Sequence, residues 1–146
     1  MTGTYFSLGK TQEERVEVEV QGYERAVSGD YHDDNWLTAE VRIRAGRFRG
    51  KVDAAILTVE LQGFLVQLRT LHETLRGVAK FETLEEQLQL TLNGDGLGHI
   101  DVTGEVADEP GIGNRLLFKL HLDQSQLGAS IRELESVTSR FPIRAA

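Results

Sequence analysis

The residues best suited to chemistry gather in residues 93–100, which read NGDGLGHI. Carboxylate and amide oxygens bind cations, and glycine-rich loops can bind phosphate through backbone N–H groups. The spacing fits neither use. An EF-hand loop aligned on Asp95 and Gly96 would place Thr91 and Val102 at its first and twelfth positions, where acidic ligands are required. No helix follows that could receive a phosphate. Asn-Gly and Asp-Gly are strong hairpin signals, so we predict a turn between two strands.

A second group of polar side chains lies in residues 30–36, which read DYHDDNW. The carboxylates and the imidazole could hold a metal ion, although no spacing in this stretch fixes a ligand set. Asp and Asn also cap turns through local hydrogen bonds, and aromatic side chains beside charges are common in binding patches. Three interpretations stay open: a packed turn, a contact with a partner, and a metal site. The residues that would touch a partner are Asp30, Tyr31, Asp33, Asp34 and Trp36.

A third polar stretch, residues 108–114, reads DEPGIGN. Pro110 fixes one backbone angle and Gly111 tolerates another, as a β-turn requires. We predict a turn here, and the alternative is an exposed acidic tip at which Asp108 and Glu109 contact a partner.

Five basic residues stand close together in residues 42–51, which read RIRAGRFRGK. Such a ribbon could bind the phosphates of a nucleic acid. We favour ion pairs with Glu17 and Glu19, which project to the same side from a neighbouring predicted strand. Aromatic side chains for base stacking are missing, because Phe48 is expected to point inward. The five residues are Arg42, Arg44, Arg47, Arg49 and Lys51.

The sequence shows no assembled catalytic set. It has no Cys and no GxSxG motif, which excludes a cysteine nucleophile and the common serine-hydrolase turn. His99 and His121 are expected on outward strand faces, but no third ligand stands at metal spacing. We therefore predict no catalytic residue, no metal and no cofactor. The alternative is a small-ligand-binding protein or an enzyme that uses a pocket near Trp36 or the polar face of the sheet.

Two periodicities predict the elements that carry these stretches. Helical spacing of apolar residues predicts amphipathic helices near 58–76 and 124–140. Short connections favour an α+β fold on a largely antiparallel sheet of six to eight strands. The segments with strand-like alternation are 16–20, 37–45, 48–56, 88–92, 100–106 and 116–122, and a short strand near 79–81 could precede the last three.

The ends of the two helices carry their own signals. Thr58 is expected to cap the first helix, and Gly77 is expected to stop it. Asp123 or Ser125 can cap the second helix, and Pro142 ends it.

The two halves of the sequence resemble each other at a shift of 66 residues. Two interpretations stay open: an ancient duplication, or two strand–helix pairs that obey the same patterning rules. The shift lays Leu61, Leu65, Leu68 and Leu71 on Leu127, Ile131, Leu134 and Val137.

The composition limits the broad class of the protein. A chain of 146 residues without a compositional break predicts a single domain, residues 1–146. No apolar run is long enough to cross a membrane, and the first residues lack the pattern of a signal peptide, so we expect a cytoplasmic protein. The net charge of −7 disfavours nonspecific binding to nucleic acid and favours basic partners.

Five stretches together carry a family resemblance: DYHDDNWL at 30–37, LHETLRG at 71–77, LNGDGLGHI at 92–100, DEPGIGNRL at 108–116 and RFPIR at 140–144. With these stretches the chain resembles the WapI family of bacterial immunity proteins, from about Val16 to Arg144. The resemblance implies a non-enzymatic cytoplasmic protein that neutralises a cognate contact-delivered toxin, understood as a basic, RNA-cleaving domain. It carries over no catalytic residue and implies neither a membrane nor a nucleic-acid partner. An acidic protein could cover the basic surface that such a toxin needs.

Overall fold

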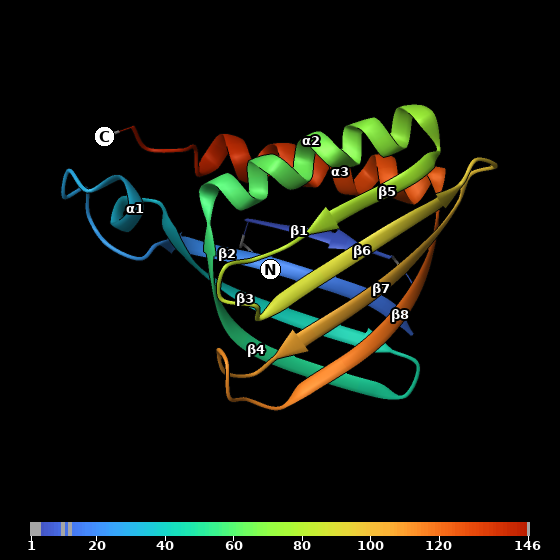
Figure 1. Cartoon of the computed structure of the whole chain (residues 1–146), viewed down its shortest axis with the longest axis horizontal. Helices are drawn as coiled ribbons and strands as arrows, with labels where there is room; N and C mark the ends of the chain where they lie inside the picture. The colour runs from blue at the N-terminus through green and yellow to red at the C-terminus, as the bar shows by residue number, and fades with distance from the viewer. Residues whose placement is uncertain (1–3, 10, 12, 146) are drawn as a thin grey trace.

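The computed structural model describes residues 4–9, 11 and 13–145. It contains two four-stranded antiparallel sheets, and a long helix follows each sheet in the chain (Figure 1). The first half comprises β1 (Thr4–Leu8), β2 (Glu14–Tyr23), α1 (Tyr31–Asp34), β3 (Trp36–Ala45), β4 (Phe48–Leu57) and α2 (Thr58–Thr74). The second half comprises β5 (Arg76–Phe81), β6 (Leu88–Asp95), β7 (His99–Ala107), β8 (Arg115–Asp123) and α3 (Gln124–Arg140).

The predicted α+β fold with antiparallel strands and two amphipathic helices is confirmed. The eight strands are divided between two sheets, in the orders β1-β2-β3-β4 and β5-β6-β7-β8. Because α2 stands between β4 and β5 in the chain, the fifth strand begins a new sheet and does not extend the first.

One strand and one helix were not predicted. In β1, Ser7 is buried between the buried Phe6 and Leu8, so the strand shows no alternation of polar and apolar residues. The helix α1 has only four residues, too few for a helical period to appear in the sequence.

The helix ends differ in part from the predicted ones. The predicted cap Thr58 is the first residue of α2, and the Glu60 carboxylate accepts a hydrogen bond from the Leu57 amide at 2.8 Å. The stop is Leu75, which adopts a left-handed backbone with φ of 61°, and not Gly77, which lies in β5. Asp123 caps α3 as predicted, accepting a hydrogen bond from the Gln126 amide at 2.9 Å.

The helices cover one side of the two sheets. In Figure 1, α2 and α3 lie across the top, and β4 and β8 lie at the bottom. The β1 edge is capped by α3, because the Ser7 amide donates to the Glu133 carboxylate at 3.0 Å. The β5 edge is capped by α2, because the Lys80 amide donates to the Gln67 side chain at 2.8 Å. One continuous apolar core joins both sheets and both helices.

Equivalent positions in the two halves make equivalent contacts. Gln67 and Glu133, which cap the two strand edges, are related by the same 66-residue shift seen in the sequence. Arg69 and Glu135 are related by that shift as well, and they form an ion pair at 2.7 Å between α2 and α3. This shared detail favours a duplicated unit over a coincidence of patterning.

Candidate partner-binding surface

The loop between β2 and β3, residues 24–35, carries most of the predicted partner-binding residues. Asp30 caps α1 by accepting hydrogen bonds from the amides of His32 at 3.0 Å and Asp33 at 3.1 Å. The Asp33 carboxylate lies 3.5 Å from the guanidinium of Arg25 and remains half exposed. Tyr31 is also partly exposed. These three predicted residues therefore face solvent on a short, capped helix.

Asp34 has a different role from its neighbours. Its side chain is buried, with 2% of the residue exposed, and its oxygens accept hydrogen bonds from the Ser28 hydroxyl, the Ser28 amide and the Gly29 amide at 2.7–2.9 Å. The hydrogen bond from the Ser28 hydroxyl is the main reason that the pKa of Asp34 is lowered, with further lowering by the two amides and Arg144. Asp34 therefore holds the loop together from inside.

Asn35 connects the loop to two distant segments. Its side-chain oxygen accepts hydrogen bonds from the Thr58 hydroxyl at 2.7 Å and from the Arg144 amide at 2.8 Å. Its side-chain amide donates to the carbonyls of Tyr31 at 2.7 Å and Arg144 at 2.9 Å. Only 1% of the residue is exposed. One buried amide thus fixes the loop, the start of α2 and the end of the chain relative to one another.

The segment after α3 packs along the same loop. The Tyr23 hydroxyl donates to the Pro142 carbonyl at 2.5 Å, and the Tyr23 ring lies 5.7 Å from the Phe141 ring. The Arg144 guanidinium lies over the Tyr23 ring at 3.4 Å from its centre, and it donates to the Arg25 carbonyl at 3.0 Å. Because Asn35 also exchanges hydrogen bonds with Arg144, the two motifs DYHDDNWL and RFPIR touch. The sequence shows both motifs but does not predict this contact, because neither motif contains a signal for the other.

The predicted turn at residues 108–114 is confirmed. The Asp108 carboxylate accepts hydrogen bonds from the Asn114 amide at 2.7 Å and from the Asn114 side chain at 3.0 Å. The Asn114 side chain is the main cause of a lowered pKa at Asp108. Glu109 is exposed beside it. Asp108 closes the turn, and Glu109 is left to face solvent.

A third loop, residues 82–87, lies between the first two. The Leu84 amide donates to the Glu60 carboxylate at 2.6 Å at the start of α2, where Thr58 also binds Asn35. The Ala107 amide donates to the Gln87 carbonyl at 2.8 Å, next to the 108–114 turn. Sequence reasoning passed over this loop because it contains no motif.

We call the three loops 24–35, 82–87 and 108–114 the acidic end of the molecule. All three lie at the left end in Figure 1. The exposed acidic residues here are Glu24, Asp30, Glu82, Glu86, Asp108 and Glu109, with Asp33 and Glu85 half exposed. The exposed apolar residues beside them are Val27, Tyr31, Leu84 and Ile112. Acidic groups around exposed apolar side chains are typical of a surface that binds a protein partner.

The other chemistry-bearing stretches have structural roles. The predicted turn in NGDGLGHI joins β6 to β7, and Asp95 accepts hydrogen bonds from the Leu97 and His99 amides. His99 lies 3.0 Å from Asp95, and His121 lies 2.9 Å from Asp101, so each histidine has its own carboxylate. Across the described ranges, no three His, Asp or Glu side chains are placed to hold a metal ion.

The predicted ion pairs of the basic ribbon are confirmed for its first member. The Arg42 guanidinium contacts the carboxylates of Glu17, Glu19 and Glu40 on its own and the neighbouring strand. Burial acts to raise the pKa of Glu17, but the hydrogen bonds and charges of Arg15 and Arg42 together lower that pKa below its usual value. This part of the ribbon is neutralised within the sheet.

Trp36 does not line the apolar pocket between the β3–β4 hairpin and β8. It begins β3 opposite Leu57, is half buried, and its carbonyl accepts a hydrogen bond from the Glu24 amide at 2.9 Å. The apolar pocket lies between the β3–β4 hairpin and β8, and neither Asp30, His32 nor Trp36 lines it.

A comparison with family models extends the resemblance seen in the motifs. Residues 7–142 match the model of the immunity protein WapI-like family. No curated protein matches the chain. None of the helices in the described residues is long and apolar enough to span a membrane. Because the match covers nearly the whole chain, the protein belongs to the immunity protein WapI-like family.

Proposed function

We propose that this protein binds a cognate toxin domain and blocks it without performing chemistry. The observation that carries this proposal is the family match over residues 7–142. The toxin domain is a basic, RNA-cleaving one, and the complex forms in the cytoplasm of the cell that is to be protected. The protein acts by covering the surface that the toxin uses on RNA.

The acidic end is the surface that suits this partner best. Its acidic side chains complement a basic surface and would accelerate encounter with it. Its exposed apolar side chains, Tyr31, Leu84 and Ile112 among them, supply the area that leaves water on binding. The loops are held by internal hydrogen bonds, so little conformational entropy is lost when a partner binds.

The predicted contact residues take two kinds of role in this proposal. Tyr31, Asp33 and Glu109 reach the partner directly, and Asp30 does so with the carboxylate oxygen that does not cap α1. Asp34 and Asp108 shape the loops that present them, because their carboxylates are occupied by Ser28 and by Asn114. Trp36 supports the loop from the first position of β3.

Growth rescue and co-purification test the proposal together. Co-expression with the toxin domain encoded at the same locus should restore growth of a susceptible host, and the two chains should purify as one complex. Replacing Asp33 and Glu109 by Ala should slow association, with a stronger effect at low salt, because rim charges act mainly through the on-rate.

A matched double variant controls for loss of charge alone. Glu73 and Asp101 are exposed acidic residues outside the three loops, and replacing both by Ala removes the same net charge. This control should leave the association rate within about twofold of the original, since distant charges contribute only a screened field. Equal slowing by both double variants would mean that net charge, and not the acidic end, drives binding. RNA binding by the free protein with a steep salt dependence would favour a nucleic-acid role instead.

A further inference from the structure

The four outer strand edges of the two sheets are covered by other parts of the chain to different extents. Helix side chains cap the β1 and β5 edges through Glu133 and Gln67. The β4 edge is capped in part by the buried Gln87, whose side chain donates to the Asp53 carbonyl at 2.8 Å and accepts from the Ala55 amide at 3.4 Å. Among the described residues, no strand is hydrogen-bonded to the outer edge of β8, although β2 and β3 approach it and the His121 amide donates to the Glu14 carboxylate at 3.3 Å. Its middle is therefore the least protected strand edge in the described part of the fold.

The register of β8 shows which backbone groups are exposed there. The amides of His121 and Asp123 point away from β7, since they donate to the side chains of Glu14 and Gln126. The pairing of β7 with β8 runs without a bulge from Arg115 to Asp123. Because the direction of the backbone N–H group alternates along a strand, the amides of Leu117 and Lys119 also point away from β7. Neither amide meets a hydrogen-bond acceptor among the described residues.

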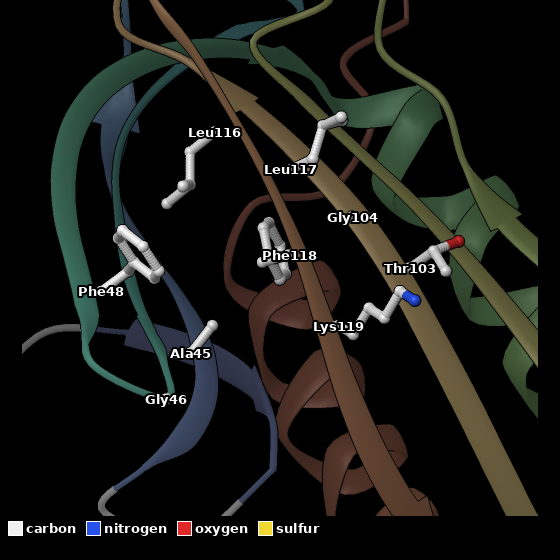
Figure 2. A pocket seen from close by; sticks show the side chains of 9 residues that line it. All are labelled: Ala45, Gly46, Phe48, Thr103, Gly104, Leu116, Leu117, Phe118 and Lys119. Atoms are coloured by element: carbon white, nitrogen blue, oxygen red, sulfur yellow. The ribbon is translucent and has the colours of Figure 1, made fainter.

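A pocket of about 550 Å³ lies directly beside these two residues. Figure 2 shows Phe48 on the hairpin side and Leu116 and Phe118 on the β8 side, arranged around one space. Gly104 contributes by having no side chain: a Cβ there would lie 2.2 Å from the ring of Phe118. The tip of the Phe118 ring therefore occupies the space that a side chain at position 104 of β7 would need.

The pocket leaves unusual apolar side chains in contact with water. Phe48 is 66% exposed and Leu117 is 75% exposed, although both belong to strands. Basic residues on an edge strand commonly discourage pairing with another chain. Two exposed apolar side chains beside open backbone groups do the opposite, because both favour the addition of a strand.

The surroundings of the pocket are basic. On the outer face of β7 and β8, Glu105 pairs with Arg115 and Asp101 pairs with His121, whereas Lys119 has no ion pair in the described ranges. On the hairpin, Arg47, Arg49 and Lys51 are exposed and also have no ion pair within those ranges. Two acidic residues also lie close to β8: Glu105, which is opposite Leu117 and pairs with Arg115, and Glu14, which accepts a hydrogen bond from the His121 amide.

We propose that the β8 edge at Leu117–Lys119 binds an extended acidic segment of a protein partner by strand addition. The added strand pairs with the open amides and carbonyls of β8. Its inward side chains are apolar and enter the space between Phe48, Leu116 and Phe118. Its outward side chains are Asp or Glu and lie beside Lys119. This surface is separate from the acidic end, and its charge is opposite, so the proposal does not depend on toxin binding.

Defined peptides can test this proposal. The probe is the heptapeptide acetyl-Glu-Val-Glu-Phe-Glu-Val-Glu-amide. Its binding to the whole protein is measured by the changes in the protein's backbone amide chemical shifts and by calorimetry. We expect saturable binding, with the largest shifts and the largest gain in hydrogen-exchange protection at Leu117 and Lys119. The same peptide methylated on alternate backbone nitrogens should bind at least about tenfold more weakly, and so should a peptide with Lys in place of Glu.

Three protein variants locate the site. Phe48→Ala should weaken binding of the acidic peptide by about tenfold. Leu97→Ala, at another exposed apolar residue, should leave the affinity for this peptide unchanged. Lys119→Glu should weaken binding of the acidic peptide and strengthen binding of the peptide with Lys in place of Glu. Equal affinity for the methylated peptide, or shifts confined to the loops of the acidic end, would overturn the proposal. Shifts at Leu117 with decanoate but not with the acidic peptide would overturn it too, and would identify a site for anionic amphiphiles.

Discussion

The acidic end exposes side chains to a partner, whereas the β8 edge exposes backbone groups. At the acidic end, the backbone is tied down by Asp30, Asp34, Asn35 and Asp108, and side chains project into solvent. At the β8 edge, the apolar side chains form a pocket and backbone amides are left open. The first arrangement recognises a partner through the chemistry of its surface. The second recognises an extended backbone, with side chains adding selectivity.

The difference follows from how each region is stabilised. The acidic end has a small share of the apolar core, so buried polar groups fix its shape. The β8 edge belongs to a sheet that is already fixed by β7 and by the core, so it can leave hydrogen-bonding groups open at little cost while water reaches them. Variants that separate the two regions should therefore act on one without disturbing the other.

The largest effect is expected from the core that both regions share. Leu68 in α2 and Leu134 in α3 are fully buried and lie at equivalent positions of the two halves. Leu68→Ala and Leu134→Ala should each lower the free energy of unfolding by about 2–5 kcal/mol. Denaturant unfolding measures both values. If one variant were nearly neutral, the two halves would not contribute equivalent helices to one core.

A smaller and local effect is expected at Asn35. Asn35→Ala removes the side chain that binds Thr58, Tyr31 and Arg144, and should cost about 2 kcal/mol because buried partners lose their hydrogen bonds. Hydrogen exchange should accelerate in residues 24–36 and 141–145 but not in β8. Asn93→Ala, at an exposed position of β6, is the control and should change neither. Faster exchange throughout the chain would contradict a local role of Asn35 in holding these two segments together.

The pH dependence of stability should report on Asp34. Its pKa is lowered in the folded state, so its contribution is present above the unfolded pKa of about 3.9 and is lost as the pH falls through the lowered folded value. Acid unfolding should therefore begin below about pH 4. Asp34→Asn should be less stable at neutral pH and should lose less stability on acidification. Ser28→Ala should reproduce part of that change, since the Ser28 hydroxyl is the main cause of the shift. An unchanged pH profile in Asp34→Asn would exclude this role.

The smallest change in stability is expected at the β8 pocket. Phe48 is mostly exposed, so Phe48→Ala should alter the free energy of unfolding by no more than about 0.5 kcal/mol, although it removes a large aromatic side chain. Thermal and denaturant unfolding would check this. A loss of several times that value would show that Phe48 belongs to the core and not to an open pocket.

The sequence predicted the elements better than their arrangement. Alternation in Val16, Val18 and Val20 and helical spacing from Leu61 to Leu71 depend on one buried face each, so they are visible locally. The division into two sheets depends on where α2 and α3 pack, which no local pattern records. The residues of the acidic loop could be listed from their types. That Asp34 is buried while Asp33 is half exposed could not, since the two are adjacent and chemically identical.

The β8 pocket shows the same limit. Residues 116–118 belonged to one predicted strand, 116–122, and Gly104 belonged to another, 100–106. Only the approach of the β3–β4 hairpin to β8 shows that these residues surround a space. The pocket and the hydrogen bonds of Asn35 are both formed by contacts between segments far apart in the chain.

Hydrogen–deuterium exchange of the toxin complex tests the central claim most directly. The protein alone and the protein bound to the toxin domain of its own locus would be compared peptide by peptide. We predict that residues 24–35, 82–87 and 108–114 gain protection in the complex, while residues 115–120 and the hairpin around Phe48 do not. Protection confined to β8 and the hairpin, with the three loops unchanged, would contradict the assignment of toxin binding to the acidic end.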